Sequence, residues 1–454
     1  MTSPDVVVVG AGIAGLRAAV VLAARGARVA ILESKAVLGG RATAFTDPQT
    51  GERVDNGQHV MMGCYHETFA FLRQLGTVDG VRVQPTLDVE FVDRAGVQSR
   101  LHLPPLPPPL NFVAGLLEWP ALGWRDRLAA LRLSGPIRIE KTGKKEEGRG
   151  KRRTRIAASP GETVEEWLIN NGQTARIREM LWEPLALAAL NQSIREAAAP
   201  AFVSILARMF GDGPQDASLA LPTRPLDELY AEPARRFIEE RGGEVRIGTP
   251  ARIHLKGGRI SHVEARGNRL EADRVVAAVP WYALVDLFEG DVGPIDAVRK
   301  AAAATSPSPI ASVNLWLSRR ILRTPFLGLP GRPLQWVFDK EQMFDSQTSH
   351  LTLVSSGADD VMALSNDELI TLALRELRDA LPEARNAKVV RASVVRERRA
   401  TYSLAPGQPT RPHTTTDVKG LVLAGDWIET GLPATIEGAA ISGRRAAEAI
   451  EEHP

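Results

Sequence analysis

The chain has 454 residues, 44% of them hydrophobic and 24% charged, so it can bury a sizeable core in two or more domains. Its 56 basic and 54 acidic residues leave a net charge of +2, which gives no global attraction to nucleic acid. The single cysteine, Cys64, excludes an internal disulfide and a thiolate metal cluster, and it favours a reducing compartment. We expect no metal site.

The apolar runs are too short for membrane insertion. None reaches the roughly 20 residues that a membrane-spanning helix needs. The first run, at residues 6–9, starts too early and is too short for a secretory signal. We therefore expect a cytoplasmic protein, either free or peripheral on the inner face of the cell membrane.

The N-terminal 33 residues have the pattern of a dinucleotide-binding turn. Residues 5–10 form a β-branched run typical of a buried parallel strand, and an alanine-rich helix is expected over 16–24, with Gly26 at its end. A second strand follows over 28–32. Glycines between strand and helix let the backbone approach a pyrophosphate, and an acid after the second strand accepts from ribose hydroxyls. The predicted cofactor contacts here are Gly10, Gly12, Ile13, Ala14, Gly15 and Glu33.

A Gly-Gly-Arg sequence follows the acid at residues 38–42. It resembles the pattern that separates FAD enzymes of the glutathione-reductase and amine-oxidase type from NAD dehydrogenases. The alternative is a plain glycine turn. In the first interpretation Gly39 and Gly40 contact the cofactor, and Arg41 offers a fixed fork of donors to its anionic groups.

A distant segment resembles the C-terminal flavin motif of the amine-oxidase and phytoene-desaturase superfamily. A short apolar run ends in Gly425 and Asp426, and residues 434–443 open a helix rich in small residues. The resemblance implies that Asp426 meets the ribityl chain and that the positive helix end, with Thr435 and Ile436, points at the flavin. Because this motif contains no cysteine, we expect FAD to be bound non-covalently.

The same resemblance implies an α/β fold: a Rossmann-like FAD-binding domain of the glutathione-reductase and amine-oxidase type with an α+β substrate domain. Residues 243–253 and 272–280 resemble the superfamily's middle segment, which places Ala251 near the adenine. The FAD-binding domain is then discontinuous, and the chain between its pieces forms a substrate and membrane-facing domain. The expected bounds are 1–66, 228–285 and 412–454 for the first domain, and 67–227 and 286–411 for the second.

Residues 54–65 favour one branch of this superfamily. They resemble a stretch of the plant-type carotene desaturases, and more closely the bacterial hydroxysqualene dehydroxylase family, which has Asp-Asn-Gly-Gln-His in this place. The similarity continues in order through residues 101–110 and 181–191. It implies a long-chain isoprenoid substrate, an allylic C30 alcohol that reduced FAD converts to squalene, with Gly57 and Gln58 beside the cofactor. It does not indicate the electron donor.

Two departures from that family stand out. Its short or acidic linker is here a strongly basic run at 140–155, and Gln192 stands where threonine is common. The first affects membrane contact, and the second affects the polarity of the pocket.

The implied reaction needs a proton for the leaving hydroxyl. His59 is our candidate acid, with Asp55 four residues earlier expected to raise its pKa. The alternative is that both side chains only position backbone beside the flavin. Glu183 is another candidate acid, although a carboxylate between Trp182 and Pro184 also fits a helix N-terminal charge.

A hydrocarbon substrate requires contact with a membrane. Residues 110–124 are apolar and include Trp119 and Trp124, which suits an interfacial helix. The basic residues of 141–155 would be attracted to anionic lipid. The alternatives are a buried core helix for the first segment and a solvated loop for the second.

Three other functions stay open. A carotenoid-type desaturase needs the same flavin and the same apolar tunnel, so the direction of hydride transfer is not determined. An amine oxidase is disfavoured because Thr435 replaces one of two flanking aromatic rings and residues 310–317 lack the usual lysine. A flavin-binding scaffold without turnover would keep Gly12 and Glu33 but needs no open space beside the flavin.

Overall fold

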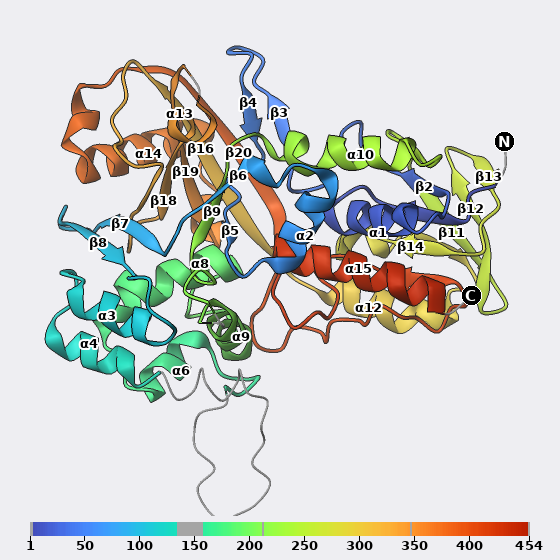
Figure 1. Ribbon diagram of the computed structural model, residues 1–454, viewed down its shortest axis with the longest axis horizontal. Coiled ribbons are helices and arrows are strands. Elements are labelled where there is room, and N and C mark those ends of the chain that lie inside the picture. The colour runs from blue at the N-terminus through green and yellow to red at the C-terminus, as the bar shows by residue number, and fades with distance from the viewer. Residues whose placement is uncertain (1–2, 134–157, 211–212, 346, 453–454) are drawn as a thin grey trace, which may run out of the picture.

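The computed structural model describes residues 3–133, 158–210, 213–345 and 347–452, which form two halves side by side (Figure 1). Both ends of the described chain lie in the same half. That half is built on a parallel sheet of order β10-β2-β1-β14-β21. Its strands are β1 (Val6–Val9), β2 (Val29–Leu32), β10 (Glu244–Arg246), β14 (Val275–Ala277) and β21 (Leu421–Leu423).

Alternation along β1 divides this half into layers. Val6 and Val8 pack against α1 (Ile13–Ala24) and α15 (Ile436–Glu452), which lie side by side on one face. These helices approach closely, since a Cβ at Gly443 would lie only 2.2 Å from the carbonyl oxygen of Ala14. The odd residues, Val7 and Val9, face a second sheet on the other side. That sheet, of order β13-β12-β11-β15, contains β11 (Ala251–Lys256), β12 (Arg259–Ala265), β13 (Asn268–Leu270) and β15 (Phe288–Gly290).

The other half is built on a seven-stranded mixed sheet of order β20-β16-β19-β18-β17-β7-β8. One face packs against a group of helices, and the other against α14 (Asn366–Ala380). The strands are β7 (Asp88–Val92), β8 (Gln98–His102), β16 (Pro307–Leu317), β17 (Phe326–Gly328), β18 (Trp336–Asp339), β19 (Ser349–Ser356) and β20 (Val389–Tyr402). The helices of the first group are α3 (Leu110–Glu118), α4 (Trp124–Leu131), α6 (Val164–Asn170), α7 (Ala175–Ile177), α8 (Glu183–Leu190) and α9 (Ala199–Met209).

Short elements connect the halves. The hairpin of β3 and β4 leads to the three-stranded sheet β5-β9-β6 and to α2, and α13 directly follows β18. Their bounds are β3 (Ala44–Thr46), β4 (Arg53–Asp55), β5 (Met61–Met62), β6 (Val81–Val83), β9 (Leu219–Pro222), α2 (His66–Leu75) and α13 (Lys340–Phe344). Three further helices pack on the half built on the parallel sheet: α10 (Glu232–Glu239), α11 (Trp281–Leu284) and α12 (Asp296–Ala304).

The expected fold class is confirmed: a doubly layered parallel sheet of the Rossmann-like type is joined to an α+β half. The parallel sheet draws its strands from residues 6–32, 244–277 and 421–423. Each of these ranges falls inside one of the three segments assigned to the FAD-binding domain, whose bounds stay a prediction.

The segment expected at a membrane interface divides between core and surface. Trp119 is 1% exposed, and its indole donates to Ser99 Oγ at 3.2 Å. Trp124, at the start of α4, is 67% exposed, and Leu110 is 58% exposed. The interpretation of a buried core helix is therefore correct only for part of this segment, and membrane contact of the exposed part stays a prediction.

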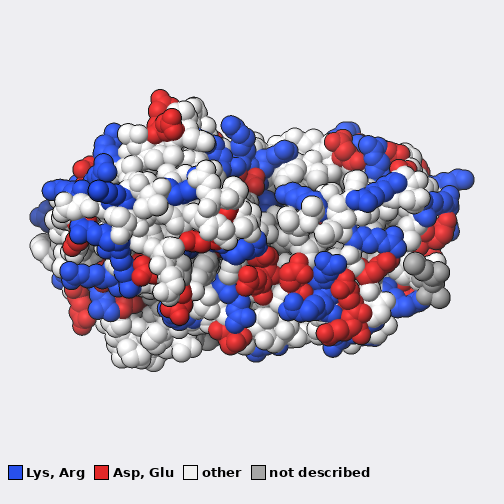
Figure 2. All heavy atoms as spheres, turned by 90° about the horizontal axis from the view of Figure 1, so that it is seen from above, with Lys and Arg blue, Asp and Glu red and all other residues white. Residues whose placement is uncertain are grey.

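The surface carries mixed charge. Figure 2 shows basic and acidic side chains interspersed on the face that it views. The basic run 141–155 lies outside the described residues. No helix among the described residues is long and apolar enough to cross a membrane.

Candidate active site

One continuous cavity of about 480 Å³ extends from the glycine turn after β1 to the aromatic wall of the other half. Most of the predicted cofactor-binding and catalytic residues line it, whereas Gly15, Ala251 and Asp55 do not. Gly15 packs inside the turn, where a Cβ would meet the carbonyl oxygen of Gly10 at 2.0 Å. The predicted residues that line the cavity are Gly10, Gly12, Ile13, Ala14, Glu33, Gly39, Gly40, Arg41, Gly57, Gln58, His59, Gly425, Asp426, Thr435 and Ile436.

Gly10 and Glu33 fix the backbone at the end of the cavity next to the glycine turn, which we call the nucleotide end. Gly10 has φ +104°, and a Cβ there would lie 2.5 Å from the carbonyl oxygen of Ala278. The Glu33 carboxylate accepts hydrogen bonds from the backbone N–H of Ala11 and of Lys35, both at 2.8 Å. A buried carboxylate facing the cavity beside an uncapped helix start is the arrangement that a ribose and a pyrophosphate require.

The guanidinium of Arg41 bonds to other groups of the protein, whereas we expected its donors to face the cofactor. Its Nη2 lies 2.5 Å from Asp426 Oδ1, and its Nη1 donates to the carbonyl oxygen of Ala400 at 2.9 Å. Two donors predicted for the cofactor are therefore bound to the protein, because the C-terminal motif brings a carboxylate to this place. The ion pair joins the first and last segments that line the cavity.

The first turn of α15 faces the cavity. Thr435 caps it, since its Oγ1 accepts from the backbone N–H of Gly438 at 3.0 Å. The carboxylate of Glu437 faces the opposite way and accepts from the backbone N–H groups of Glu67 and Thr68 at 2.9 and 2.8 Å. The positive end of the helix is thus directed at the cavity, where it favours negative charge on a bound cofactor.

His59 lines the cavity, whereas Asp55 lies behind it. Asp55 is buried and accepts from Lys340 Nζ at 3.0 Å. Burial lowers the pKa of His59, and this outweighs the attraction of Asp55, while the charge of Lys340 lowers it further. Asp55 therefore raises the pKa of His59 as expected, but the net pKa is lowered, because burial of the imidazole has the larger effect. Its Nδ1 is buried without a hydrogen-bond partner among the described residues.

Glu183 does not reach the cavity. Its neighbours Trp182 and Pro184 line it, but the Glu183 carboxylate accepts from the backbone N–H of Ile194 at 2.9 Å. Burial raises the pKa of Glu183. This carboxylate holds the chain that follows α8, so it is not placed to donate a proton to a molecule in the cavity.

The seven-stranded sheet forms one wall of the cavity. The side chains of this wall become less polar from β20 and β19 toward β17 and β7. Near the nucleotide end, Ile310 on β16 pairs with Glu397 on β20 and with Ser356 on β19. Further along, Trp336 on β18 pairs with Gly328 on β17, and Phe91 on β7 covers that glycine. The remaining apolar lining includes Leu101, Phe112, Leu185, Met209, Phe210, Phe326 and Phe338.

Lys340 is the residue that sequence reasoning missed. The segment 310–317 contains no lysine, but Lys340 reaches the back of the cavity from α13 and donates to Gln58 Oε1 as well as to Asp55. Its side chain is 3% exposed. Nothing in the residues around it marks a functional lysine, because its partners lie 282 and 285 positions away.

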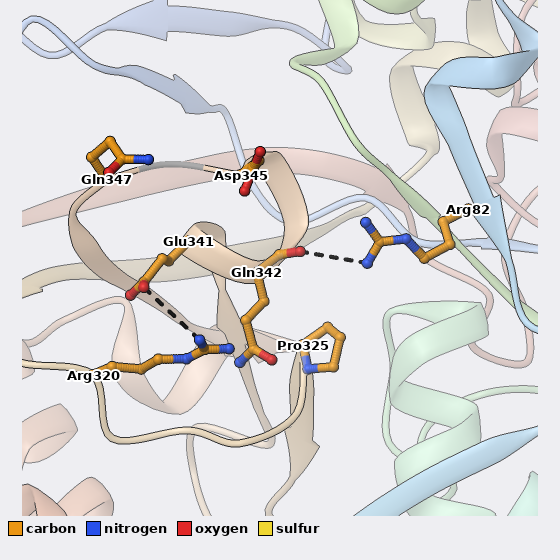
Figure 3. Close-up of a pocket in the computed structure, with 7 residues that line it drawn as sticks. All are labelled: Arg82, Arg320, Pro325, Glu341, Gln342, Asp345 and Gln347. Atoms are coloured by element: carbon orange, nitrogen blue, oxygen red, sulfur yellow. Dashed lines mark hydrogen bonds and ion pairs between the residues drawn. The ribbon is translucent and has the colours of Figure 1, made fainter.

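The outer side of α13 borders a second, polar pocket at the surface (Figure 3). Arg320 Nη1 lies 4.0 Å from Glu341 Oε1, and Arg82 Nη1 donates to the carbonyl oxygen of Gln342 at 3.5 Å. Two basic and two acidic side chains line this pocket, and Arg320 and Glu341 pair with one another. It offers no net charge to select a ligand.

Comparison with known proteins identifies the family. The model of the flavin containing amine oxidoreductase family matches residues 13–451. The chain belongs to this family. It is an FAD-dependent oxidoreductase.

Individual relatives differ in what they act on. The chain is 29% identical to a hydroxysqualene dehydroxylase of Sinorhizobium fredii, over 98% of this chain and 97% of that protein. It is 26% identical to a chloroplastic/chromoplastic 15-cis-phytoene desaturase of Capsicum annuum, over 98% and 77% of the two chains. A solved structure of wild-type putrescine oxidase bound to putrescine superposes with a TM-score of 0.72 at 19% identity, covering 99% of each chain. This last similarity shows the fold alone.

Proposed function

We propose that this flavin oxidoreductase reduces hydroxysqualene to squalene. The observation that carries the proposal is the cavity itself, which joins the FAD-binding turn to a long wall of aliphatic and aromatic side chains with few polar groups. A C30 hydrocarbon with one hydroxyl matches that lining. The similarity to proteins named hydroxysqualene dehydroxylase, at 25 to 29% identity, supports the same substrate.

The proposed reaction consumes no molecular oxygen, and its atoms and electrons balance as follows. The allylic C–O bond breaks with its electron pair on oxygen, which takes a proton and leaves as water. Reduced FAD supplies the hydride that forms the new C–H bond. The apolar walls exclude water from the cationic carbon until that bond has formed.

His59 is the proposed proton donor. Its pKa is lowered by burial, so its imidazolium is a stronger acid than an exposed one but is less populated at neutral pH. We therefore expect the dehydroxylation rate to rise as pH falls below the ordinary histidine pKa of about 6.5. Asp55 pairs with Lys340, and we propose that it holds the loop that carries His59 in position and does not act as an acid.

The second candidate function is desaturation of a carotenoid-type polyene. The similarity to 15-cis-phytoene desaturases favours it, and the same cavity would hold such a substrate. It differs in direction, since oxidised FAD would accept hydride. Amine oxidation has less support, because Thr435 faces the cavity where an aromatic ring would be needed.

We also propose that the protein collects its substrate from an anionic membrane surface. Leu110, Leu117, Trp124 and Leu128 on α3 and α4 are each about half exposed or more, at 58%, 49%, 67% and 50%. Phe112, on the same helix as Leu110, lines the cavity. The helix that carries Leu110 and Leu117 at the surface therefore also contributes to the apolar cavity wall, and the basic run 141–155 would add electrostatic attraction.

An anaerobic single-turnover experiment tests the proposed reaction. The enzyme is photoreduced and mixed with hydroxysqualene, with flavin absorbance and squalene measured together. We expect flavin reoxidation matched by one equivalent of squalene. Oxidised enzyme mixed with phytoene or putrescine should stay oxidised. Bleaching of the oxidised flavin by phytoene would instead support the desaturase.

A further inference from the structure

We infer that Lys340 is a positioning residue, which orients the amide of Gln58 so that it presents a hydrogen-bond donor to the flavin in the cavity. The inference rests on the FAD site and needs no assumption about which isoprenoid the enzyme reduces.

Each of the three N–H donors of the Lys340 ammonium faces a group of the protein. An ammonium group has three N–H donors and no acceptor. One points to Asp55 Oδ2 at 3.0 Å and another to Gln58 Oε1. The ammonium also lies 4.6 Å from the ring centre of Phe344, over its face, which takes the third direction. Lys340 is therefore fully engaged behind the cavity and does not itself contact a bound molecule.

This engagement determines the orientation of Gln58. Because an ammonium only donates, the Gln58 oxygen must face Lys340 and the amide nitrogen must face away. One hydrogen of that nitrogen is directed at the carbonyl oxygen of His59, 3.3 Å away. The other remains for the cavity that Gln58 lines. Without Lys340, the amide would be free to turn its oxygen toward the cavity.

The Gln58 loop stands next to the flavin-binding elements. The backbone N–H of Asn56 donates to the carbonyl oxygen of Thr43 at 2.8 Å, and its side chain lies 3.4 Å from the carbonyl oxygen of Arg41. Arg41 in turn pairs with Asp426. Gln58, two residues after Asn56, lines the same cavity as Arg41 and Asp426. A donor there is placed to reach a flavin bound beside these residues, where a hydrogen bond to the ring would stabilise its electron-rich reduced form.

The two sides of α13 fit this role. Asp339 caps the helix, and its carboxylate accepts from the backbone N–H of Gln342 at 3.3 Å. Glu341 and Gln342 face the surface pocket of Figure 3, whereas Lys340 is buried on the inner side. The helix thus connects the wall strand β18, which carries Trp336 and Phe338, to the loop that faces the flavin.

The test uses a charge-balanced pair of substitutions. Lys340→Met alone leaves the buried Asp55 carboxylate without its partner, so we expect a lower melting temperature. The double variant Asp55→Leu, Lys340→Met replaces the ion pair with apolar side chains and should recover much of that loss. In both variants Gln58 loses the group that orients it. Lys300→Met is the matched control, because Lys300 is exposed and pairs with Asp296 at 2.7 Å at the surface.

The decisive readout is the flavin midpoint potential, measured by anaerobic titration without substrate. We expect a more negative potential in the double variant and in Gln58→Met, no change in Lys300→Met, and no further change when Gln58→Met is added to the double variant. Turnover should fall about tenfold, the effect of losing one hydrogen bond near the reacting centre.

A stable double variant with the wild-type potential would overturn the inference, as would additive shifts from Gln58 and Lys340. Because the titration contains no isoprenoid, its result stands apart from the outcome of the hydroxysqualene experiment.

Discussion

Arg41 and Asp426 lie 385 positions apart in the chain and form an ion pair of 2.5 Å at the flavin end of the cavity. The pair closes the site between the Gly-Gly-Arg segment and the C-terminal motif. Asp426→Asn should weaken FAD binding by about tenfold or more, because the half-buried guanidinium loses its charged partner. Titration of apoprotein with FAD measures the effect.

The control for this variant is Asp5→Asn. Asp5 pairs with Arg28 at 3.2 Å, but both side chains are more than two-fifths exposed, so that pair contributes little. Equal FAD affinity in wild type and Asp426→Asn would show that the ion pair does not hold the cofactor site together.

A buried histidine makes stability sensitive to acid. Burial lowers the pKa of His350 to about 3, and Nε2 lies 3.1 Å from Asn314 Oδ1. The folded state then binds fewer protons than the unfolded chain between pH 6.5 and 3, so this contribution is present above pH 6.5 and is lost as pH falls. Between pH 6.5 and 5 the loss is about 2 kcal/mol.

His350→Gln, which keeps a donor for Asn314, should flatten that decline in melting temperature. His413→Gln is the control, since His413 is exposed. Asp47, whose pKa is held low by a hydrogen bond from Arg391, adds acid sensitivity only below about pH 4. An unchanged slope between pH 6.5 and 5 in His350→Gln would assign the sensitivity to other groups.

Membrane contact is expected to depend on exposed apolar side chains. Replacing Trp124 and Leu128 with serine should reduce sedimentation with vesicles that contain anionic lipid, and leave turnover of detergent-dispersed substrate intact. Deleting residues 141–153 should reduce the same binding and make it less sensitive to salt. Binding that persists in both variants would place the contact elsewhere, and loss of turnover in detergent would show a structural role.

The nucleotide end of the site was predictable because its signals are local. Gly10, Gly12 and Glu33 fall within one strand, turn, helix and strand, and their spacing alone indicates the chemistry. The position of Asp426 was also predictable, through its motif. The ion pair between Asp426 and Arg41 was not predictable. Each of the two motifs assigns its charged group to the cofactor, and neither motif shows that the two groups neutralise each other.

The other misses come from tertiary structure. The pKa of His59 depends on burial, which no neighbour in the sequence reports. Lys340 follows an ordinary strand, and its role arises only when β18 is folded against the Gln58 loop. The sequence does not show that Glu183 is bound to the backbone, because its partner, the N–H of Ile194, depends on how the chain turns after α8.

The proposed acid has its own test. His59→Ala should slow single-turnover reduction of hydroxysqualene by roughly 10²- to 10⁴-fold, the usual contribution of a general acid, while FAD remains bound. The wild-type rate should rise as pH falls through about 6.5, and the variant rate should not. A variant with the wild-type rate would remove His59 from the chemistry.

Hydride transfer from the flavin to carbon is the central claim, and isotope labelling tests it most directly. The apoprotein is reconstituted with reduced 5-deaza-FAD that carries deuterium at C5, where the C–D bonds do not exchange with solvent, and is mixed with hydroxysqualene in H₂O under anaerobic conditions. The account predicts squalene with one deuterium on the carbon that held the hydroxyl, formed as the flavin is oxidised. Squalene without deuterium, or a desaturated product from oxidised enzyme and phytoene, would contradict it.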